Sequence, residues 1–403
     1  MRSRLATAAC ALIAALLASC SSTSQGSSGL PGSAGTTQTP QVLPGAVPHS
    51  ALGLLRMQAE GKLPGPVPIK VLRAELKRFE TQPRPHFNLS PNATGVQIWS
   101  AMTDAGYVLG SSANGKKINA SVDTETQTTP GYYPTGLKVD HSRNLWVANE
   151  LGSSKSGGVV QEYADGKLAN AYSVQCPSPA GCNYLYSASF DVAVSSKNVF
   201  AALEYMDYEV CYPSCSSYNI SGFEYWQNGN PSATPTLLSV GNYCSPVCAL
   251  GWADVDSSGN LWFTDSGYYD GTHYGYGLGE VANPTTNPKY TQVEPPGTYS
   301  FWGGVYVSNG GKTLNVIDEG TRKVYQYALP LSSGGTPFNT LTPCQSGCSP
   351  TSGGFNKGDT KMVIGDANDW LDIGDVATNH WKQSKAPQMN SSLLGAAYTP
   401  SDK

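Results

Sequence analysis

The stretch from Ala249 to Asp265 constrains the fold most strongly, because it encodes a complete β-hairpin. It reads ALGWADVDSSGNLWFTD. Two short runs rich in aromatic and aliphatic residues flank a polar segment from Asp256 to Asn260. Gly and Asn tolerate the positive φ that tight hairpin turns need, so the pattern predicts two antiparallel strands joined close to Gly259.

The same order of strand, polar turn and strand recurs along the chain. Four further copies occupy Gly136–Asn149, Asp191–Glu204, Gly304–Asp318 and Gly354–Asp366. A repeat of roughly 40–50 residues, each copy a few strands long, is typical of a β-propeller, whose blades are four-stranded antiparallel sheets. The hairpins therefore predict the two inner strands, A and B, of five blades. The segments between the hairpins predict the outer strands, C and D.

Two segments near the ends of this domain complete the count. Residues 96–123 predict outer strands that lack an inner one, and Leu393–Lys403 predicts an inner strand without outer ones. Together they make one blade, and a ring closed by its two termini has no exposed sheet edge. We therefore predict an all-β, six-bladed propeller over residues 93–403, closed by the strand at residues 393–403.

The hairpins resemble those of NHL-type propellers, in which a Gly-Asn turn precedes a strand that ends in Asp. The sequence DEGTRKV at Asp318–Val324 is similar to the motif that follows this Asp. The resemblance extends to related six-bladed propellers of the TolB-like and gluconolactonase types. It implies the fold, whereas the function has to be argued from the site.

The first twenty residues predict export and lipid attachment. Arg2 and Arg4 form a basic region, and Leu5–Leu17 is apolar but too short to span a bilayer comfortably. The sequence LASC, ending at Cys20, is similar to the lipobox of bacterial lipoproteins, which implies a signal peptide at residues 1–19 and lipid on Cys20. An ordinary secretory signal with an incidental cysteine is the alternative. We expect an extracytoplasmic protein of the cell envelope, lipid-anchored to a bacterial membrane through Cys20.

Residues 20–48 and 49–92 predict two further zones before the propeller. The first is rich in Ser, Gly, Thr and Pro and cannot bury enough apolar surface to fold, so it predicts a flexible tether. In the second, Ser50–Glu60 and Ile69–Glu80 have helical spacing, with a proline-rich break between them. We expect two short helices that pack against the propeller, with a partner-binding helix as the alternative.

Composition narrows the range of partners. Charged residues make up 13% of the chain and the net charge is −4, so the sequence offers no basic surface for a nucleic acid. After the signal peptide, no segment is continuously apolar over a length that could span a bilayer. The acyl chains on Cys20 are therefore the expected membrane contact.

The turns and loops divide unequally between the two faces of the predicted propeller. The A–B and C–D turns are short and share one face, whereas the other face carries the long B–C and D–A loops. Loops on a rigid scaffold commonly hold binding residues, and tyrosine offers a large contact area together with a hydroxyl. We expect this face to bind a glycan or a polypeptide, although packing between loops is the alternative. The candidate contacts are Tyr268, Tyr269, His273, Tyr274 and Tyr276.

Eight cysteines remain once Cys10 leaves with the signal peptide and Cys20 is lipidated. In an oxidising compartment their close spacing predicts disulfides that stiffen loops of the tyrosine-rich face. Zinc is the rival ligand, but no histidine accompanies the cysteines at finger-like spacing. The predicted near-neighbour pairs are Cys176/Cys182, Cys211/Cys215, Cys244/Cys248 and Cys344/Cys348.

Asp191 and Asp254 are the acidic residues of the predicted inner strands. The gluconolactonase and senescence-marker-protein family holds a divalent cation in its channel with Glu, Asn and Asp of these strands. The resemblance implies Asp191 and Asp254 as candidate ligands for Ca²⁺ or another divalent cation, although the Glu of the family pattern is not apparent. The ends of the B strands form a second candidate oxygen set, with capping of the local turn as the alternative. These residues are Asn149, Glu204, Asp265, Asp318 and Asp366.

Two functions follow from these expectations. The sequence contains no G-x-S-x-G elbow, P-loop or H-E-x-x-H motif. The first function is therefore a membrane-tethered, non-catalytic binding module that needs no cofactor. The alternative is a lactonase or hydrolase that uses a divalent metal in the central channel.

Overall fold

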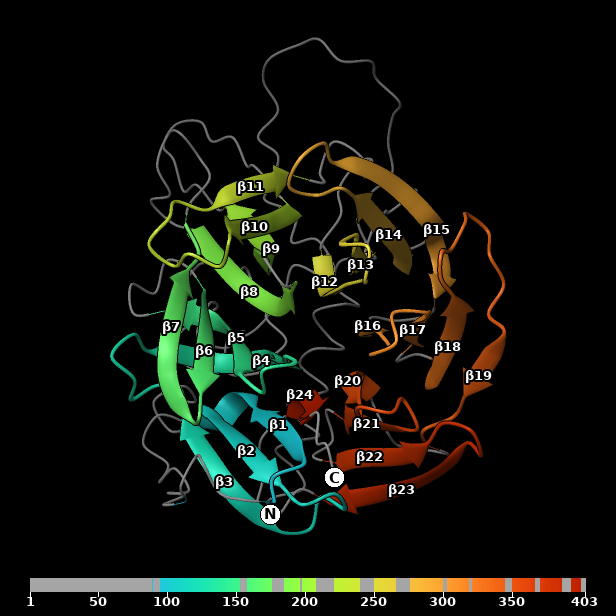
Figure 1. Ribbon diagram of the computed structural model, residues 1–403, viewed down its shortest axis with the longest axis horizontal. Coiled ribbons are helices and arrows are strands. Elements are labelled where there is room, and N and C mark those ends of the chain that lie inside the picture. The colour runs from blue at the N-terminus through green and yellow to red at the C-terminus, as the bar shows by residue number, and fades with distance from the viewer. Residues whose placement is uncertain are drawn as a thin grey trace, which may run out of the picture. The chain divides into compact units, whose positions relative to one another are not determined.

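The computed structural model describes the predicted propeller region (Figure 1). This region belongs to one compact unit of residues 84–207 and 218–403, whereas the other unit, residues 1–83 and 208–217, lies outside the described residues. Among the described residues, no helix is long and apolar enough to cross a membrane. The signal peptide, the tether and the two N-terminal helices stay predictions. The described residues are 89, 95–152, 158–175, 185–195, 198–207, 221–239, 250–265, 276–299, 303–318, 321–344, 350–366, 370–385 and 393–399.

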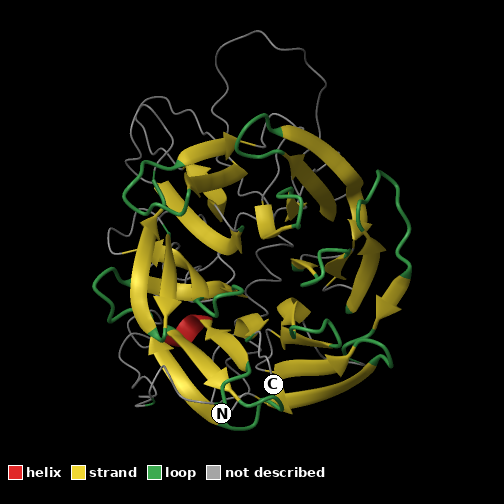
Figure 2. Cartoon of the chain, in the orientation of Figure 1, coloured by secondary structure: helices red, strands yellow, loops and turns green. Residues whose placement is uncertain are grey.

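Six antiparallel sheets of four strands each form the propeller, as predicted (Figure 2). We number them as blades in chain order, each from its inner strand outward. Blade 1 is β24-β1-β2-β3, and blades 2 to 6 are β4–β7, β8–β11, β12–β15, β16–β19 and β20–β23. Within the described residues the structure is all-β, apart from the single 3-10 turn η1 (Thr103–Ala105).

The bounds of the strands follow the predicted hairpins closely. Blades 1 to 3 comprise β24 (Leu393–Tyr398), β1 (Ile98–Met102), β2 (Tyr107–Ser111), β3 (Ile118–Asp123), β4 (Gly131–Val139), β5 (Leu145–Gly152), β6 (Val159–Ala164), β7 (Lys167–Ser173), β8 (Leu185–Val194), β9 (Asn198–Asp207), β10 (Ser221–Gln227) and β11 (Thr236–Ser239). Blades 4 to 6 comprise β12 (Leu250–Val255), β13 (Leu261–Asp265), β14 (Tyr276–Ala282), β15 (Lys289–Tyr299), β16 (Val305–Val307), β17 (Thr313–Asp318), β18 (Lys323–Ala328), β19 (Asn339–Leu341), β20 (Pro350–Phe355), β21 (Lys361–Asp366), β22 (Trp370–Asp375) and β23 (His380–Lys385).

The two ends of the domain meet in blade 1. β24 pairs antiparallel with β1, with Trp99 opposite Ala397. The Thr399 N–H then donates to the Gln97 carbonyl at 2.8 Å. The inner strands contact one another in the order β24, β4, β8, β12, β16, β20 and back to β24. The C-terminal strand therefore closes the ring, which confirms the prediction drawn from the unpaired terminal segments.

An Asp–Asn–Trp arrangement closes the A–B turn of blade 2. Asp140 Oδ1 accepts from the Asn144 N–H at 2.8 Å, and Oδ2 accepts from Asn144 Nδ2 at 3.2 Å and Trp146 Nε1 at 3.1 Å. One carboxylate thus satisfies the turn backbone and also fixes the aromatic residue at the second position of the next strand. Blade 4 repeats the same three contacts with Asp256, Asn260 and Trp262.

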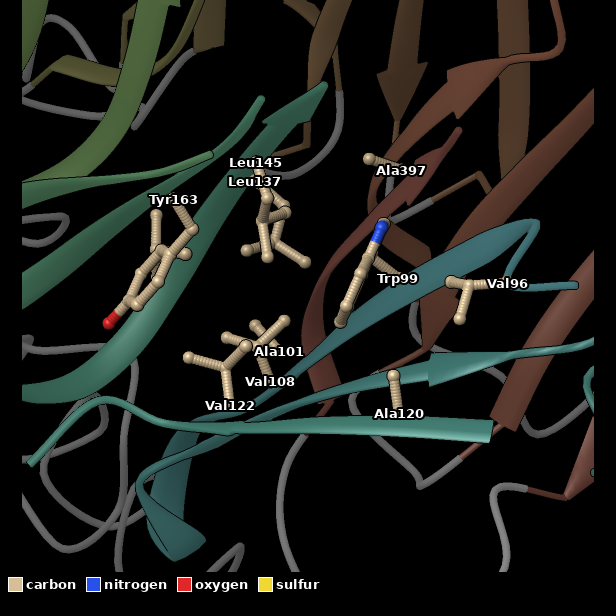
Figure 3. Close-up of a cluster of buried hydrophobic side chains, with 11 residues drawn as sticks. Val96, Trp99, Ala101, Val108, Ala120, Val122, Leu137, Leu145, Tyr163 and Ala397 are labelled. Atoms are coloured by element: carbon tan, nitrogen blue, oxygen red, sulfur yellow. The ribbon is translucent and has the colours of Figure 1, made fainter. Parts of the chain in front are cut away.

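Apolar side chains fill the spaces between neighbouring blades, as Figure 3 shows for blades 1 and 2. Trp99 and Val108 of blade 1 pack with Leu137, Leu145 and Tyr163 of blade 2, and all five are at most 8% exposed. Burying a side chain of this size stabilises the fold by about 1.5–3 kcal/mol. Because every such cluster needs two blades, the ring gains stability when it closes.

Candidate functional site

Three large polar side chains occupy one shared position of the inner strands, two residues before the A–B turn begins. They are Lys138 on β4, Asp254 on β12 and Tyr306 on β16. The inner strands surround the axis of the ring (Figure 1), so small residues at this position in the other blades leave room for the three to meet. The small residues are Ala193, Gly354 and Ala397.

Lys138 and Asp254 form an ion pair between blades that are not neighbours. The Lys138 ammonium lies 3.2 Å from Asp254 Oδ2, and the two side chains are 14% and 16% exposed. The same ammonium lies 4.3 Å from the centre of the Tyr306 ring, a distance that allows a cation–π interaction. Side chains from blades 2, 4 and 5 therefore contact one another near the axis.

Asp254 also binds the backbone of the next blade. Its Oδ2 accepts from the Val307 N–H at 2.8 Å, and its Oδ1 accepts from the Val255 N–H at 3.0 Å. Both oxygens are thus engaged by fixed donors of the chain. Since Val307 lies on β16, the carboxylate joins blade 4 to blade 5.

Asp191 makes the corresponding link between blades 3 and 4. It is 1% exposed, and its Oδ2 accepts from the Ala253 N–H at 3.0 Å. Burial raises the pKa of the Asp191 carboxyl from 3.8 to about 7, although the Lys138 ammonium and hydrogen bonds from Ala253 and Val192 oppose the shift. Asp191 thus holds β8 against β12 from a buried position.

Tyr306 and Ser352 continue these links to the remaining blades. Tyr306 is 3% exposed, and its hydroxyl is hydrogen-bonded to the Ser352 side chain and the Gly353 backbone. Burial raises the pKa of Tyr306 well above its ordinary value, so the hydroxyl keeps its proton. Ser352 Oγ in turn accepts from the Ala396 N–H at 3.3 Å. We call Lys138, Asp191, Asp254, Tyr306 and Ser352 the channel clasp, because together they join the inner strands of all six blades.

The channel clasp offers few free oxygens to a divalent cation. Ca²⁺ takes 6–8 oxygen ligands, whereas both oxygens of Asp254 already accept from donors of the protein. Across the described parts of the chain, no three residues among His, Cys, Asp and Glu are grouped so that they could hold a metal ion. The geometry therefore favours a structural role for Asp191 and Asp254, and cation binding by this pair stays a prediction.

Two of the described B-strand ends make hydrogen bonds within their own blades. Asp318 accepts from the Thr321 hydroxyl at 2.8 Å and the Thr321 N–H at 3.4 Å, which caps the local turn as the alternative interpretation expects. Asn149 Nδ2 donates to the Val159 carbonyl at 3.1 Å and to Gln161 Oε1 at 3.1 Å. At these two positions the amide and carboxylate groups are used within one blade.

Most of the predicted ligand contacts and cysteines lie outside the described residues. Tyr276 begins β14, but its side chain is not among those described. Cys344 is 5% exposed after β19, and its predicted partner Cys348 is not described, so this pairing stays a prediction. The other predicted site residues outside the described ranges are Tyr268, Tyr269, His273, Tyr274, Cys176, Cys182, Cys211, Cys215, Cys244 and Cys248.

Three members of the channel clasp were not predicted as site residues: Lys138, Tyr306 and Ser352. The signal for two of them is present in the aligned hairpins, because Lys138 and Tyr306 stand at the same distance before the turn as Asp254. A basic, an acidic and an aromatic residue at one repeated position indicate a contact across the axis. Ser352 carries no comparable signal, since serine is common in turns and strands alike.

Comparisons with known proteins support the fold and leave the family open. No protein-family model matches the chain, and no curated protein matches it. Among solved structures, a chain of the nidogen/laminin complex is similar with a TM-score of 0.52 at 11% identity, covering 76% of this chain and 98% of its own. Regucalcin, a calcium-binding protein from Agrobacterium tumefaciens, has a TM-score of 0.44 at 15% identity, covering 66% of this chain and 77% of its own. A provisionally assigned 6-phosphogluconolactonase from Bacteroides fragilis has a TM-score of 0.44 at 10% identity, covering 75% of this chain and 97% of its own. At these identities the likeness concerns the fold alone: the chain is a six-bladed β-propeller.

Proposed function

We propose that this protein is an extracytoplasmic, lipid-anchored β-propeller that acts as a non-catalytic binding module. The observation that carries this proposal is the ion pair between Lys138 and Asp254 at 3.2 Å. It places an ammonium group against a carboxylate of the channel, where the metal-dependent alternative needs a cation. The side chains of the channel then hold the blades together, and the loops bind the ligand.

Chemical catalysis in the channel would need side chains that can reach a substrate. A general acid or base has to come within hydrogen-bond distance of the proton it transfers. Asp254 has both oxygens bound by the chain, and Tyr306 and Ser352 are at most 3% exposed. A rigid ring whose channel side chains are hydrogen-bonded within the chain suits a scaffold that presents loops to a ligand.

The proposed ligand is a glycan or a polypeptide, bound on the face that carries the B–C and D–A loops. Tyr268, Tyr269, Tyr274 and Tyr276, with His273, are the proposed contacts. Tyrosine buries a large area at low conformational cost, and short disulfide loops would reduce that cost further. A low entropic cost of binding would explain why cysteines and tyrosines occur together in these loops.

A divalent-metal-dependent lactonase is the second candidate, and one observation favours it. The pKa of Asp191 is raised to about 7 by burial, which is the range of a general base that operates at neutral pH. The side chain is 1% exposed, so this candidate also requires the channel to open around Asp191. Asp254 supplies a second carboxylate from β12, the inner strand next to β8. This candidate requires Asp254 to exchange the Lys138 ammonium for a metal ion.

Titration with metal ions and assay with a lactone separate the two candidates. We expect millimolar Ca²⁺, Mg²⁺ or Zn²⁺ to leave the melting temperature of the full chain unchanged, and we expect no metal-dependent hydrolysis of gluconolactone. Asp254→Asn is the matched control, because it removes the charge and keeps the shape of the side chain. The binding-module proposal fails if a metal stabilises the wild type, this variant abolishes the effect, and lactone hydrolysis follows the same pattern.

Replacing Cys20 by Ser tests the membrane anchor. A Cys20→Ser chain cannot accept lipid, so we expect it to move from the membrane fraction to the soluble extracytoplasmic fraction. Cell fractionation followed by immunoblotting measures the change, and Cys10→Ser is the control because Cys10 precedes the expected cleavage site. A Cys20→Ser protein that stays with the membrane would show that another segment anchors the chain.

A further inference from the structure

A cavity of about 370 Å³ opens on the face formed by the A–B turns. Its volume falls within the range of small-molecule sites, roughly 300–1,000 Å³. The lining comes from the turns of three blades: His141 and Arg143 of blade 2, Asn309 and Gly310 of blade 5, and Lys357 and Asp359 of blade 6.

The ring order places this cavity over the axis. Counting along the contacting inner strands, blade 2 and blade 5 stand on opposite sides of the ring. A cavity lined by Arg143 and Asn309 must therefore span the centre, at the end of the channel. His141, Asn309 and Lys357 share the second position of their turns, so the repeat itself brings these side chains together.

The charge of the lining is positive. Arg143 and Lys357 carry two positive charges, and His141 adds a third donor group. Asp359 carries the negative charge of the lining, and its carboxylate is directed at the neighbouring turn. Its Oδ1 accepts from the Asn309 N–H at 2.8 Å and from Asn309 Nδ2 at 3.0 Å, and its Oδ2 accepts from the Gly310 N–H at 3.0 Å. Asp359 thus fixes the cavity wall between blades 5 and 6, whereas Arg143 belongs to blade 2 on the opposite side of the cavity.

Arg143 occupies a backbone position that favours glycine. Its φ is +69°, and the equivalent residues of blades 4 and 5 are Gly259 at +85° and Gly311 at +68°. A non-glycine residue in this conformation costs roughly 1–2 kcal/mol. In blade 2 this cost arises at Arg143, whose guanidinium is part of the cavity lining. The same position of blade 6 holds Asp359 at φ +53°, so two residues of the cavity lining adopt this conformation.

We propose that this cavity binds a small molecule through an oxyanion, a phosphate or carboxylate group. The planar guanidinium of Arg143 can donate two parallel hydrogen bonds to such a group, and Lys357 supplies a second positive charge. The site uses the A–B turns, so it is separate from the tyrosine-rich loops of the proposed function. Failure of one proposal leaves the other intact.

Calorimetric titration of the full chain with inorganic phosphate and with citrate tests the site. We expect saturable binding at low ionic strength that weakens as salt is added, because exposed charges are screened. Arg143→Gly should weaken binding at least tenfold, about 1.4 kcal/mol, without lowering the melting temperature, since glycine accepts the positive φ of this turn. The double variant with Lys357→Gln should abolish binding. Preference for phosphate or for citrate identifies the oxyanion.

Lys312→Gln is the matched control, because Lys312 is exposed on the A–B turn of blade 5 but does not line the cavity. It removes the same charge and should leave the affinity unchanged. The proposal is overturned if the wild type shows no saturable binding of either anion, or if the double variant binds as tightly as the wild type. An equal loss of affinity in Lys312→Gln would also overturn it, because the effect would then come from net charge.

Discussion

A chain that ends at Ser392 is expected to lose cooperative unfolding altogether. It lacks β24, whose residues Ala396, Ala397 and Tyr398 are at most 5% exposed. Without β24, blade 1 has no inner strand, and the contacts of β24 with β4, β20 and β21 disappear. The loss opens the ring on both sides of one blade, which exposes an unpaired sheet edge and two apolar interfaces. Thermal and urea denaturation followed by circular dichroism measure the effect.

A chain that ends at Thr399 is the control for this truncation. It retains all of β24 and the hydrogen bond from Thr399 to Gln97. We expect it to unfold like the full chain. A synthetic peptide of residues 393–403 added to the shorter chain should restore part of the transition. If the chain ending at Ser392 unfolds with the midpoint of the full chain, ring closure by β24 is not needed for stability.

Removing the carboxylate of Asp254 should cost about 3 kcal/mol of unfolding free energy, the lower end of the range for breaking a buried ion pair, because the two side chains are 14% and 16% exposed. In Asp254→Ala the Lys138 ammonium loses its partner at 3.2 Å, and the Val307 and Val255 N–H groups lose their acceptor. Lys138→Met should cost less, because Asp254 keeps both backbone donors. Urea denaturation of the two single variants and the double variant gives the coupling energy, which we expect to be at least about 1 kcal/mol.

Lys312→Met is the control for the ion-pair series. Lys312 is exposed, so its replacement should change the unfolding free energy by less than about 0.5 kcal/mol. Additive costs in the double variant would mean that Lys138 and Asp254 do not stabilise each other. A cost for Asp254→Ala no larger than that of the Lys312 control would remove the basis for the channel clasp.

The local sequence was enough to predict the blades because each hairpin is built from near neighbours in the chain. Asp140, Asn144 and Trp146 recognise one another within a single turn, and blade 4 repeats the pattern. Turn chemistry and alternation therefore specify the hairpin before any blade packs on another. The same reasoning predicted the closing strand, because an inner strand without partners and outer strands without an inner one complete a single blade.

The channel clasp could not be predicted in the same way. Asp191 and Asp254 are visible as acidic residues of inner strands, and the family resemblance suggested metal ligands. Their contacts depend on residues far away in the sequence, such as Lys138 for Asp254 and Ala253 for Asp191. The inner strands also shift register within their hairpins, between Ser189 and Val192 on β8 and between Leu250 and Ala253 on β12. Such irregularities change the face of the sheet to which a side chain points, so the alternation of apolar and polar residues does not predict it.

The sequence by itself thus determined the repeating unit, the number of blades and the closure of the ring, because these depend on contacts within a turn or a pair of strands. The tertiary structure decided which side chains meet at the axis. It set Lys138 against Asp254 and Tyr306, and it gathered Arg143 and Lys357 from two separate turns around one cavity. The physical reason is the geometry of the ring: residues at one repeated position lie far apart in the chain, and only the closed ring brings them within contact distance.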